Sequence, residues 1–174
     1  MKYKKPMIIT LIIFGTLLMI LIIGRLNLFI RFSKEVKELF AKSRSISGKK
    51  FTYTQLAGLP EPVQRYFKLI LKEGQPYISY ARITHDGQFK TGLDKNWINI
   101  KGEQYATTEK PGFIWKGSTT MFTARDMYIA DSGRLVVSLF SIYNIVDGRG
   151  KAFDQGELLR WLGESVLYPT NLLP

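Results

Sequence analysis

The residues that could do acid–base chemistry are few and scattered. His85 is the single histidine and is followed by Asp86-Gly87, a dipeptide typical of tight hairpin turns. A turn histidine is therefore favoured over a proton-transferring pair. The other carboxylates that could converge are Glu61, Glu103, Glu109, Asp126, Asp131 and Asp147. No spacing forces these carboxylates together, so we interpret them as solvated surface, and we predict no catalytic residue.

Metal, thiol and phosphate chemistry find no support in the sequence. The absence of cysteine excludes disulfides, thiol catalysis and thiolate metal sites. One histidine does not make an ordinary zinc site. The segment Gly148-Arg149-Gly150 is too short for a nucleophile elbow or a phosphate loop, and we interpret Asp147 with Arg149 as a loop-bracing ion pair. We predict no metal and no cofactor. We leave enzymatic activity open and favour a protein that is not an enzyme.

The aromatic residues have two interpretations. They pack in the core, or some of them line a concave apolar surface that binds a ligand. The candidate ligand-binding residues are Trp97, Tyr105, Phe113, Trp115, Phe122 and Trp161.

An apolar run opens the chain and predicts a membrane anchor. Residues 7–24 carry no charge, and such a helix is about 27 Å long at about 1.5 Å per residue. The span extends to Ile30 if Arg25 snorkels. We predict a cytoplasmic tail at 1–6 and a transmembrane signal anchor at 7–30, with the lipid bilayer as partner through Met7–Ile30. A cleaved signal peptide and a buried core helix are the alternatives.

The distribution of charge predicts where the chain acts. Residues 1–50 hold 11 basic and 2 acidic residues, and residues 51–174 hold 14 and 12, so the excess lies beside the membrane. No basic stripe marks the rest of the chain, and we predict no nucleic-acid partner. Basic residues flank both sides of the anchor, but long domains translocate largely regardless of charge. We expect a single-pass protein of the cell membrane whose domain lies outside the cytoplasm.

A stem and linker at 31–50 connect the anchor to the domain. Apolar residues from Leu28 to Phe40 recur with helical spacing among basic residues. This amphipathic helix either extends the anchor or lies in the headgroup layer. The domain itself spans residues 51–174.

Short strands framed by two helices are predicted in the domain. Gly58-Leu59-Pro60-Glu61-Pro62 opens the first helix, and Asp154 with Glu157 caps a second that stops at Pro169. His85–Gly87 forms a hairpin turn, Leu135–Tyr143 is the longest strand, and Val146–Lys151 is a glycine loop. The remaining strands are Tyr77–Ile83, Gln88–Thr91, Trp97–Lys101, Glu103–Thr108, Phe113–Thr120 and Arg125–Ala130. Leu135–Tyr143 is apolar on both faces, so we expect both to be covered.

Several phrases resemble one family of proteins. They are LPEPVQRYF (59–67), GEQYATTEKPGFIW (102–115), VDGRG (146–150) and LLRWLGESVLYPTNLLP (158–174). They resemble a family of uncharacterised, often membrane-anchored bacterial proteins, known as a domain of unknown function, over residues 56–174. The resemblance implies no activity and no site residue. Members of that family continue past the last phrase, so the chain looks C-terminally truncated and its sheet incomplete.

These observations predict a fold and rank three functions. The fold class is α+β: a transmembrane helix, then a curved antiparallel meander with two flanking helices. The first function is a membrane-anchored envelope protein that binds a lipid or other hydrophobic ligand on a concave sheet face. The second is a structural or interaction module whose protein partner covers an open sheet. The third is a carboxylate-based hydrolase.

Overall fold

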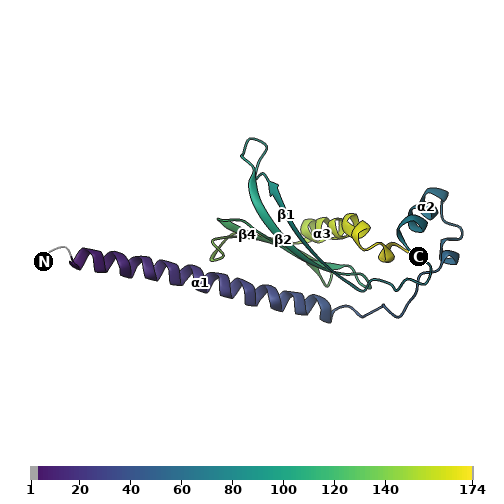
Figure 1. The fold of residues 1–174 in the computed structure, drawn as a ribbon, viewed down its shortest axis with the longest axis horizontal. Coiled ribbons are helices and arrows are strands. Elements are labelled where there is room, and N and C mark those ends of the chain that lie inside the picture. The colour runs from purple at the N-terminus through teal and green to yellow at the C-terminus, as the bar shows by residue number, and fades with distance from the viewer. Residues whose placement is uncertain (1–3, 174) are drawn as a thin grey trace.

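A long helix and a six-stranded antiparallel sheet make up most of the chain (Figure 1). The computed structural model describes residues 4–173, so the part of the predicted tail at 1–3 lies outside them. The strands lie in chain order: β1 Tyr80–Phe89, β2 Ile98–Thr107, β3 Gly112–Ser118, β4 Phe122–Ile129, β5 Ser132–Leu139 and β6 Tyr143–Arg149. The helices are α1 Lys4–Ala41, α2 Glu61–Ile70 and α3 Lys151–Glu164, with short 3-10 turns at Tyr53–Leu56, Ser165–Leu167 and Pro169–Leu172. The α+β prediction is confirmed.

Helix α1 joins the apolar run and the stem without a break. The hydroxyls of Thr10 and Thr16 donate to carbonyls four residues earlier, at 3.0 and 2.9 Å, so the apolar half leaves few polar groups unsatisfied. Residues 6–23 are exposed, whereas Phe32 and Leu39 are buried. Among the described residues, α1 is the one helix long and apolar enough to cross a membrane, as an anchor or a signal sequence would.

Helices cover the two faces of the sheet. Phe32, Val36, Leu39 and Phe40 of α1 pack on one face, against residues that include Ile114 and Met127. On the other face α3 and the turn after it bury Trp161 and Tyr168 against Phe113 and Tyr128. Gly133 lets α3 approach β5, because a Cβ there would lie 2.2 Å from the Phe153 carbonyl oxygen. The expectation that Leu135–Tyr143 is covered on both faces holds for Leu135–Leu139, which is buried or half-buried, and is wrong beyond it, since Phe140, Ile142 and Tyr143 are exposed.

The predicted hairpin turn at His85–Gly87 is wrong. All three residues lie inside β1, which pairs with β2 over ten consecutive residues, and the chain reverses between residues 90 and 97. Trp97–Lys101 and Glu103–Thr108 are likewise not two strands, since β2 runs through Gly102. Gly102 leaves room for the His85 ring rather than forming a turn, because a Cβ at this position would lie 1.9 Å from Nε2 of His85.

Leu135–Tyr143 is not one strand. Phe140 and Ser141 adopt φ values of 50° and 64°, and the tight turn that they form separates β5 from β6. Apolar residues on both sides of this turn hid it, because turn prediction relies on Gly, Asn and Asp. The predicted glycine loop is also wrong, since Val146–Arg149 belongs to β6 and only Gly150, at φ 99°, turns the chain.

Helix α3 begins three residues earlier than predicted. Gly150 precedes its first turn without a side-chain cap. Asp154 instead accepts a hydrogen bond from the backbone N–H of Gly133 at 2.8 Å, so this carboxylate ties α3 to β5 rather than capping its own helix. The helix ends at Glu164, before the predicted stop at Pro169.

A separate small core lies at the end of the molecule away from the N-terminus. Helix α2, the preceding 3-10 turn and the linker bury Phe51, Leu56, Phe67, Leu71 and Tyr77 together. Lys50 pairs with Pro76 in an isolated antiparallel bridge, which holds the linker against the start of the sheet. This core fixes the far end of the domain and stands apart from the site described next.

Candidate functional site

A cavity of about 470 Å³ lies where α1 passes the β3–β4 and β5–β6 turns. Its α1 wall is made of Leu18, Leu21, Ile22, Arg25, Leu28 and Phe29. Residues 18, 21 or 22, 25, and 28 or 29 follow one another at intervals of three or four, so they share one side of the helix. Five of the six are apolar, so this wall suits a hydrocarbon chain better than a polar solute.

The opposite wall is built from the ends of the strands. It consists of Lys116, Ser118, Thr119, Thr120, Met121, Phe122, Thr123, Phe140 and Ser141. The Thr119 hydroxyl accepts from the N–H groups of Met121 and Phe122, at 3.2 and 3.0 Å, and fixes the β3–β4 turn. The Phe140 N–H donates to the Met121 carbonyl at 2.7 Å, so the two turns are held side by side. The wall is therefore preformed, with hydroxyls beside apolar side chains.

Two cations line this cavity, Arg25 and Lys116. The Lys116 ammonium lies 3.3 Å from Oε2 of Glu103 and 4.1 Å from the ring centroid of Phe32. Burial raises the pKa of Glu103, but hydrogen bonds from Tyr105, Arg82 and Lys116 outweigh burial and hold that pKa below its usual value. Among the described residues Arg25 forms no ion pair. Its charge is therefore available to an anionic group.

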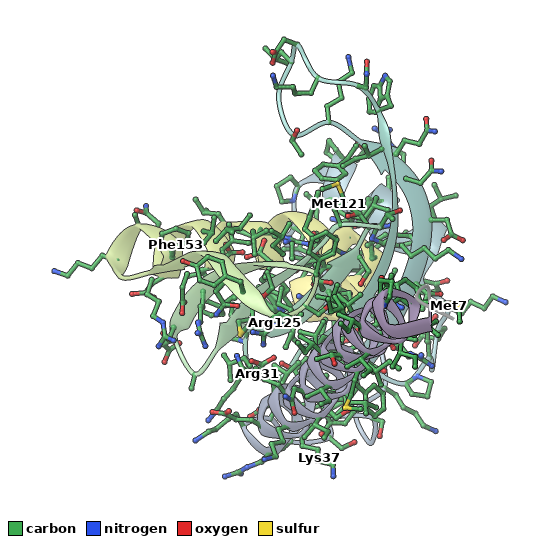
Figure 2. All side chains as sticks on the ribbon, turned by 90° about the vertical axis from the view of Figure 1, so that its left-hand side faces the viewer. Met7, Arg31, Lys37, Met121, Arg125 and Phe153 are labelled. Carbon is green, nitrogen blue, oxygen red and sulfur yellow. The ribbon has the colours of Figure 1, made fainter. Side chains whose placement is uncertain are left out.

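A second cavity of about 240 Å³ lies on the other side of α1. Arg31, Arg125 and Asn144 contribute polar groups to it, and Ile20, Ile23 and Ile142 contribute apolar surface. Figure 2, which views the molecule from the N-terminal side of α1, shows Arg125 between the sheet and the helix. The Arg125 guanidinium is buried and pairs with Glu35. Within the described part of the chain, its Nε and Nη2 have no hydrogen-bond partner.

The structure does not bring the six candidate aromatic residues together. Phe122 lines the larger cavity and contacts Phe89 edge-on at 5.7 Å. Tyr105 lies on the α1 face between Phe32 and Phe40, and its hydroxyl donates to Glu103 at 2.8 Å.

The other four aromatic candidates lie elsewhere. Phe113 of β3 and Trp161 of α3 are buried between the helix and the sheet. Trp97 is 61% exposed beside the β1–β2 turn, with the Lys90 ammonium 5.1 Å from its ring centroid. Trp115 lies on the α3 face, over Gly117, and its indole N–H donates to Nε2 of His85 at 3.0 Å.

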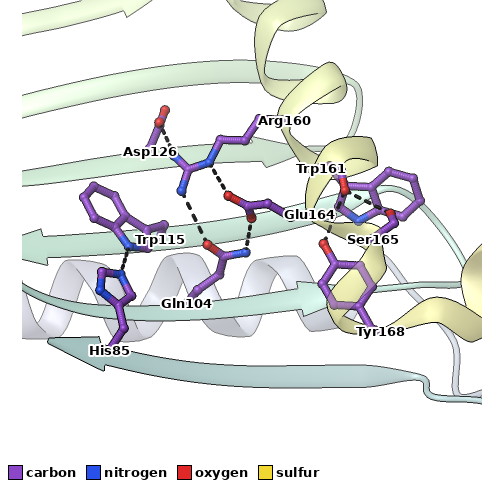
Figure 3. Close-up of polar contacts among 9 residues, drawn as sticks. All are labelled: His85, Gln104, Trp115, Asp126, Arg160, Trp161, Glu164, Ser165 and Tyr168. Atoms are coloured by element: carbon purple, nitrogen blue, oxygen red, sulfur yellow. Dashed lines mark hydrogen bonds and ion pairs between the residues drawn. The ribbon is translucent and has the colours of Figure 1, made fainter. Parts of the chain in front are cut away.

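A polar cluster fills the α3 face beside Trp115 (Figure 3). Arg160 pairs with Asp126, donates to Glu164 at 2.9 Å, and lies 5.2 Å from the ring centroid of Trp115. Gln104 donates to the other oxygen of Glu164 at 2.5 Å. The contacts of Arg160 with Asp126 and of Glu164 with Gln104 bridge α3 and the sheet, so the first role of this network is to dock the helix.

Glu157 adds a third carboxyl group to the cluster. Burial, a hydrogen bond with Asp126 and the charge of Asp126 raise the pKa of Glu157 to about 8. A carboxyl group whose pKa is raised beside a second carboxyl group is an arrangement that carboxylate catalysis uses. The two cavities described above are lined by other residues.

Sequence reasoning missed both cavities. Their walls combine residues of α1 with residues about a hundred positions later, and helical spacing alone did not say what the second half of α1 faces. The available signal was Arg25, because a charge within an otherwise apolar segment often belongs to a functional site.

Comparison with known proteins gives a family and no function. A family model described as a family of unknown function (DUF6544) matches residues 49–174. No curated protein and no solved structure matches the chain.

Proposed function

The chain belongs to the DUF6544 family of unknown function, and from that premise we propose that it is a membrane-anchored protein that binds a lipid or similar apolar ligand between α1 and the β3–β4 turn. The carrying observation is the cavity of about 470 Å³, with an apolar helix wall, a hydroxyl-lined sheet wall and two cations. A lipid matches this lining, because its apolar chain suits the helix wall and its polar, often anionic, headgroup suits the hydroxyls and cations.

The anchor is supported by the contrast between the two halves of α1. Its first half keeps large apolar side chains exposed, as with Leu11 at 63% and Phe14 at 67%, whereas its second half packs on the sheet. Burial of such a surface in hydrocarbon is strongly favourable. Arg25 then lies at the level of the headgroups, beside the cavity.

The proposed location is the cell membrane, with a single span and the domain outside the cytoplasm. Lys4 and Lys5 precede the span, and the domain that follows is long, which favours its translocation. In this orientation the cavity opens toward the outer leaflet and would receive its ligand from there.

Native mass spectrometry of the detergent-solubilised full chain tests the ligand. We expect a lipid-sized adduct on the wild type. Ser118→Trp, which places an indole in the cavity, removes the adduct. Ser132→Trp is the matched control because Ser132 is exposed at the opposite end of the sheet, and this variant keeps the adduct. A wild type without adduct, or an unchanged adduct on Ser118→Trp, contradicts the proposal.

A protein-interaction module is the second candidate. In Figure 1 the β1–β2 hairpin extends beyond α3, which leaves part of its strands uncovered. His85 is exposed there, and β1 and β6 form the two edges of the sheet. A partner that covers this surface would protect the β1 amides from hydrogen exchange in the full chain, whereas a lipid in the cavity would not.

A hydrolase is the third candidate, and the Asp126–Glu157 pair is the observation behind it. Such an enzyme would lose all activity in Asp126→Asn. A chain that co-purifies with lipid and retains it in Asp126→Asn supports the binding function over the hydrolase.

A further inference from the structure

The antiparallel meander sorts its turns between two ends. The β1–β2, β3–β4 and β5–β6 turns share one end of the sheet, and the β2–β3 and β4–β5 turns share the other. The first end faces the middle of α1, where the apolar run ends: a Cβ on Gly24 would lie 2.6 Å from Cγ1 of Ile142. The second end faces the C-terminal half, where Leu39 approaches Gly112. We call them the anchor end and the far end.

Among the turns of the sheet, large apolar side chains are exposed in those at the anchor end. The exposed fractions there are Leu93 99%, Trp97 61%, Met121 57%, Phe140 44%, Ile142 49% and Tyr143 69%. The far-end turns read Thr108-Glu109-Lys110-Pro111 and Ala130-Asp131. Soluble surfaces seldom gather apolar side chains in this way, so the anchor end has the composition of an interaction surface.

The β5–β6 turn places a phenylalanine where backbone geometry disfavours it. Phe140 has φ 50°, in the left-handed region, which is costly for a bulky residue. The far-end turn with the same geometry uses Ala130 and Asp131. A strained, exposed Phe at a hairpin tip indicates that the side chain is kept for contact with something apolar.

The occupant follows from continuity with α1. The uncharged run of α1 ends at Gly24, and Gly24 packs against Ile142, so the turns lie at the level where the span leaves the hydrocarbon. Arg25 lines the same cavity as Met121 and Phe140. Apolar tips beside a basic residue suit the boundary between acyl chains and anionic headgroups.

We propose that the β3–β4 and β5–β6 turns dip into the bilayer that α1 crosses, with Met121, Phe140 and Ile142 in the acyl–headgroup boundary. The sheet then contacts the membrane through these two turns, in addition to the anchor helix. The β1–β2 turn lies at the same end but farther from α1 (Figure 1), and it is not part of this contact. The inference rests on the anchoring part of the proposed function.

Nitroxide labels test the depth of the turns. The chain lacks cysteine, so Phe140→Cys and Met121→Cys each carry one label in vesicles of phosphatidylcholine with a minor share of phosphatidylglycerol. We compare collision rates with oxygen, which concentrates in hydrocarbon, and with a water-soluble nickel complex. Leu17→Cys marks the span, and Leu69→Cys is the matched exposed apolar control on α2, 83% exposed.

We expect both turn labels to favour oxygen over nickel, with ratios between those of Leu17→Cys and Leu69→Cys. Turn labels as accessible to nickel as Leu69→Cys, with Leu17→Cys still protected, overturn this inference and leave the anchor standing. Exposure of Leu17→Cys to nickel overturns the anchor as well. Turn labels that are immobile and shielded from both reagents point to a protein partner and overturn the inference.

Discussion

Arg125 is a buried side chain that fastens α1 to the sheet. Its side chain is 1% exposed and pairs with Glu35 of α1, whose own side chain is 14% exposed. Taking both charges out of water is costly, and their attraction offsets that cost only while both are present. The pair is therefore better evidence for a specified docking position of α1 than for stability.

Breaking this pair from one side is expected to be severe. Glu35→Gln leaves the Arg125 charge buried without a counter-charge, and we expect a loss of about 3–5 kcal/mol in the free energy of unfolding. The double variant Glu35→Leu with Arg125→Met removes both charges and lies near the wild type or above it. Chemical denaturation in detergent micelles measures both.

Glu61→Gln is the matched control for this experiment. Glu61 pairs with Arg65 in an exposed i, i+4 contact, 73% and 71% exposed. Its loss changes stability by about 0.5 kcal/mol or less. If Glu35→Gln costs no more than Glu61→Gln, the pair does not fasten α1.

Among the elements, α3 is the one whose docking depends on pH. The pKa of Glu157 rises from 4.5 to about 8 in the folded protein, mainly through burial and then through Asp126. The folded state thus holds this proton more tightly than the unfolded state does. The contribution of the protonated Glu157 to the free energy of unfolding is complete below pH 4.5 and is lost as the pH rises toward about 8.

We predict that the thermal midpoint falls between mildly acidic and mildly alkaline pH, and that Glu157→Gln flattens this fall. Glu61→Gln keeps the wild-type dependence. Asp147 acts in the opposite sense but only in acid, because Arg134 and Arg149 hold its pKa below the ordinary value of 3.8. A Glu157→Gln variant with the full wild-type slope refutes the assignment.

Hydrophobic periodicity predicted the elements better than the turn-forming residues did. The helical spacing of Phe32, Val36 and Leu39 and the doubly apolar strand near Val136 gave the layers correctly, because burial depends on pattern. Turn chemistry misled at Gly87 and at Phe140. Gly87 lies within a pairing of ten residues between β1 and β2, and the hydrogen bonds of that pairing outweigh the turn preference of one Asp-Gly dipeptide. Phe140 forms a tight turn that residue propensities do not predict.

The candidate site could not be predicted in the same way. Its walls depend on which strands α1 crosses, and that is decided by contacts such as Gly24 with Ile142, far apart in sequence. The aromatic candidates shared a residue type but not a face: Tyr105 and Trp115 lie on opposite sides of the sheet. Composition finds apolar residues and leaves their neighbours undetermined.

For the whole molecule, the orientation in the membrane is a direct test. An enzyme reporter that is active only outside the cytoplasm, fused after residue 174, is expected to be active. Replacing Lys2, Lys4 and Lys5 by Gln weakens the charge bias and moves part of the population to the reverse orientation. A silent external reporter with an active cytoplasmic one would mean that the basic segment from Arg25 to Arg44 sets the topology.

The continuity of α1 has a consequence in time. The chain is made from its N-terminus, so the proposed span is available to the bilayer before any strand exists. Phe32, Val36 and Leu39 must then wait for β2, β3 and β4 before they have a sheet to pack on. During that interval the membrane surface is the apolar phase nearest to them, and amphipathic helices bind there. Each strand pairs with its predecessor, so the sheet can grow in the order of synthesis and take over this helix face from the lipid.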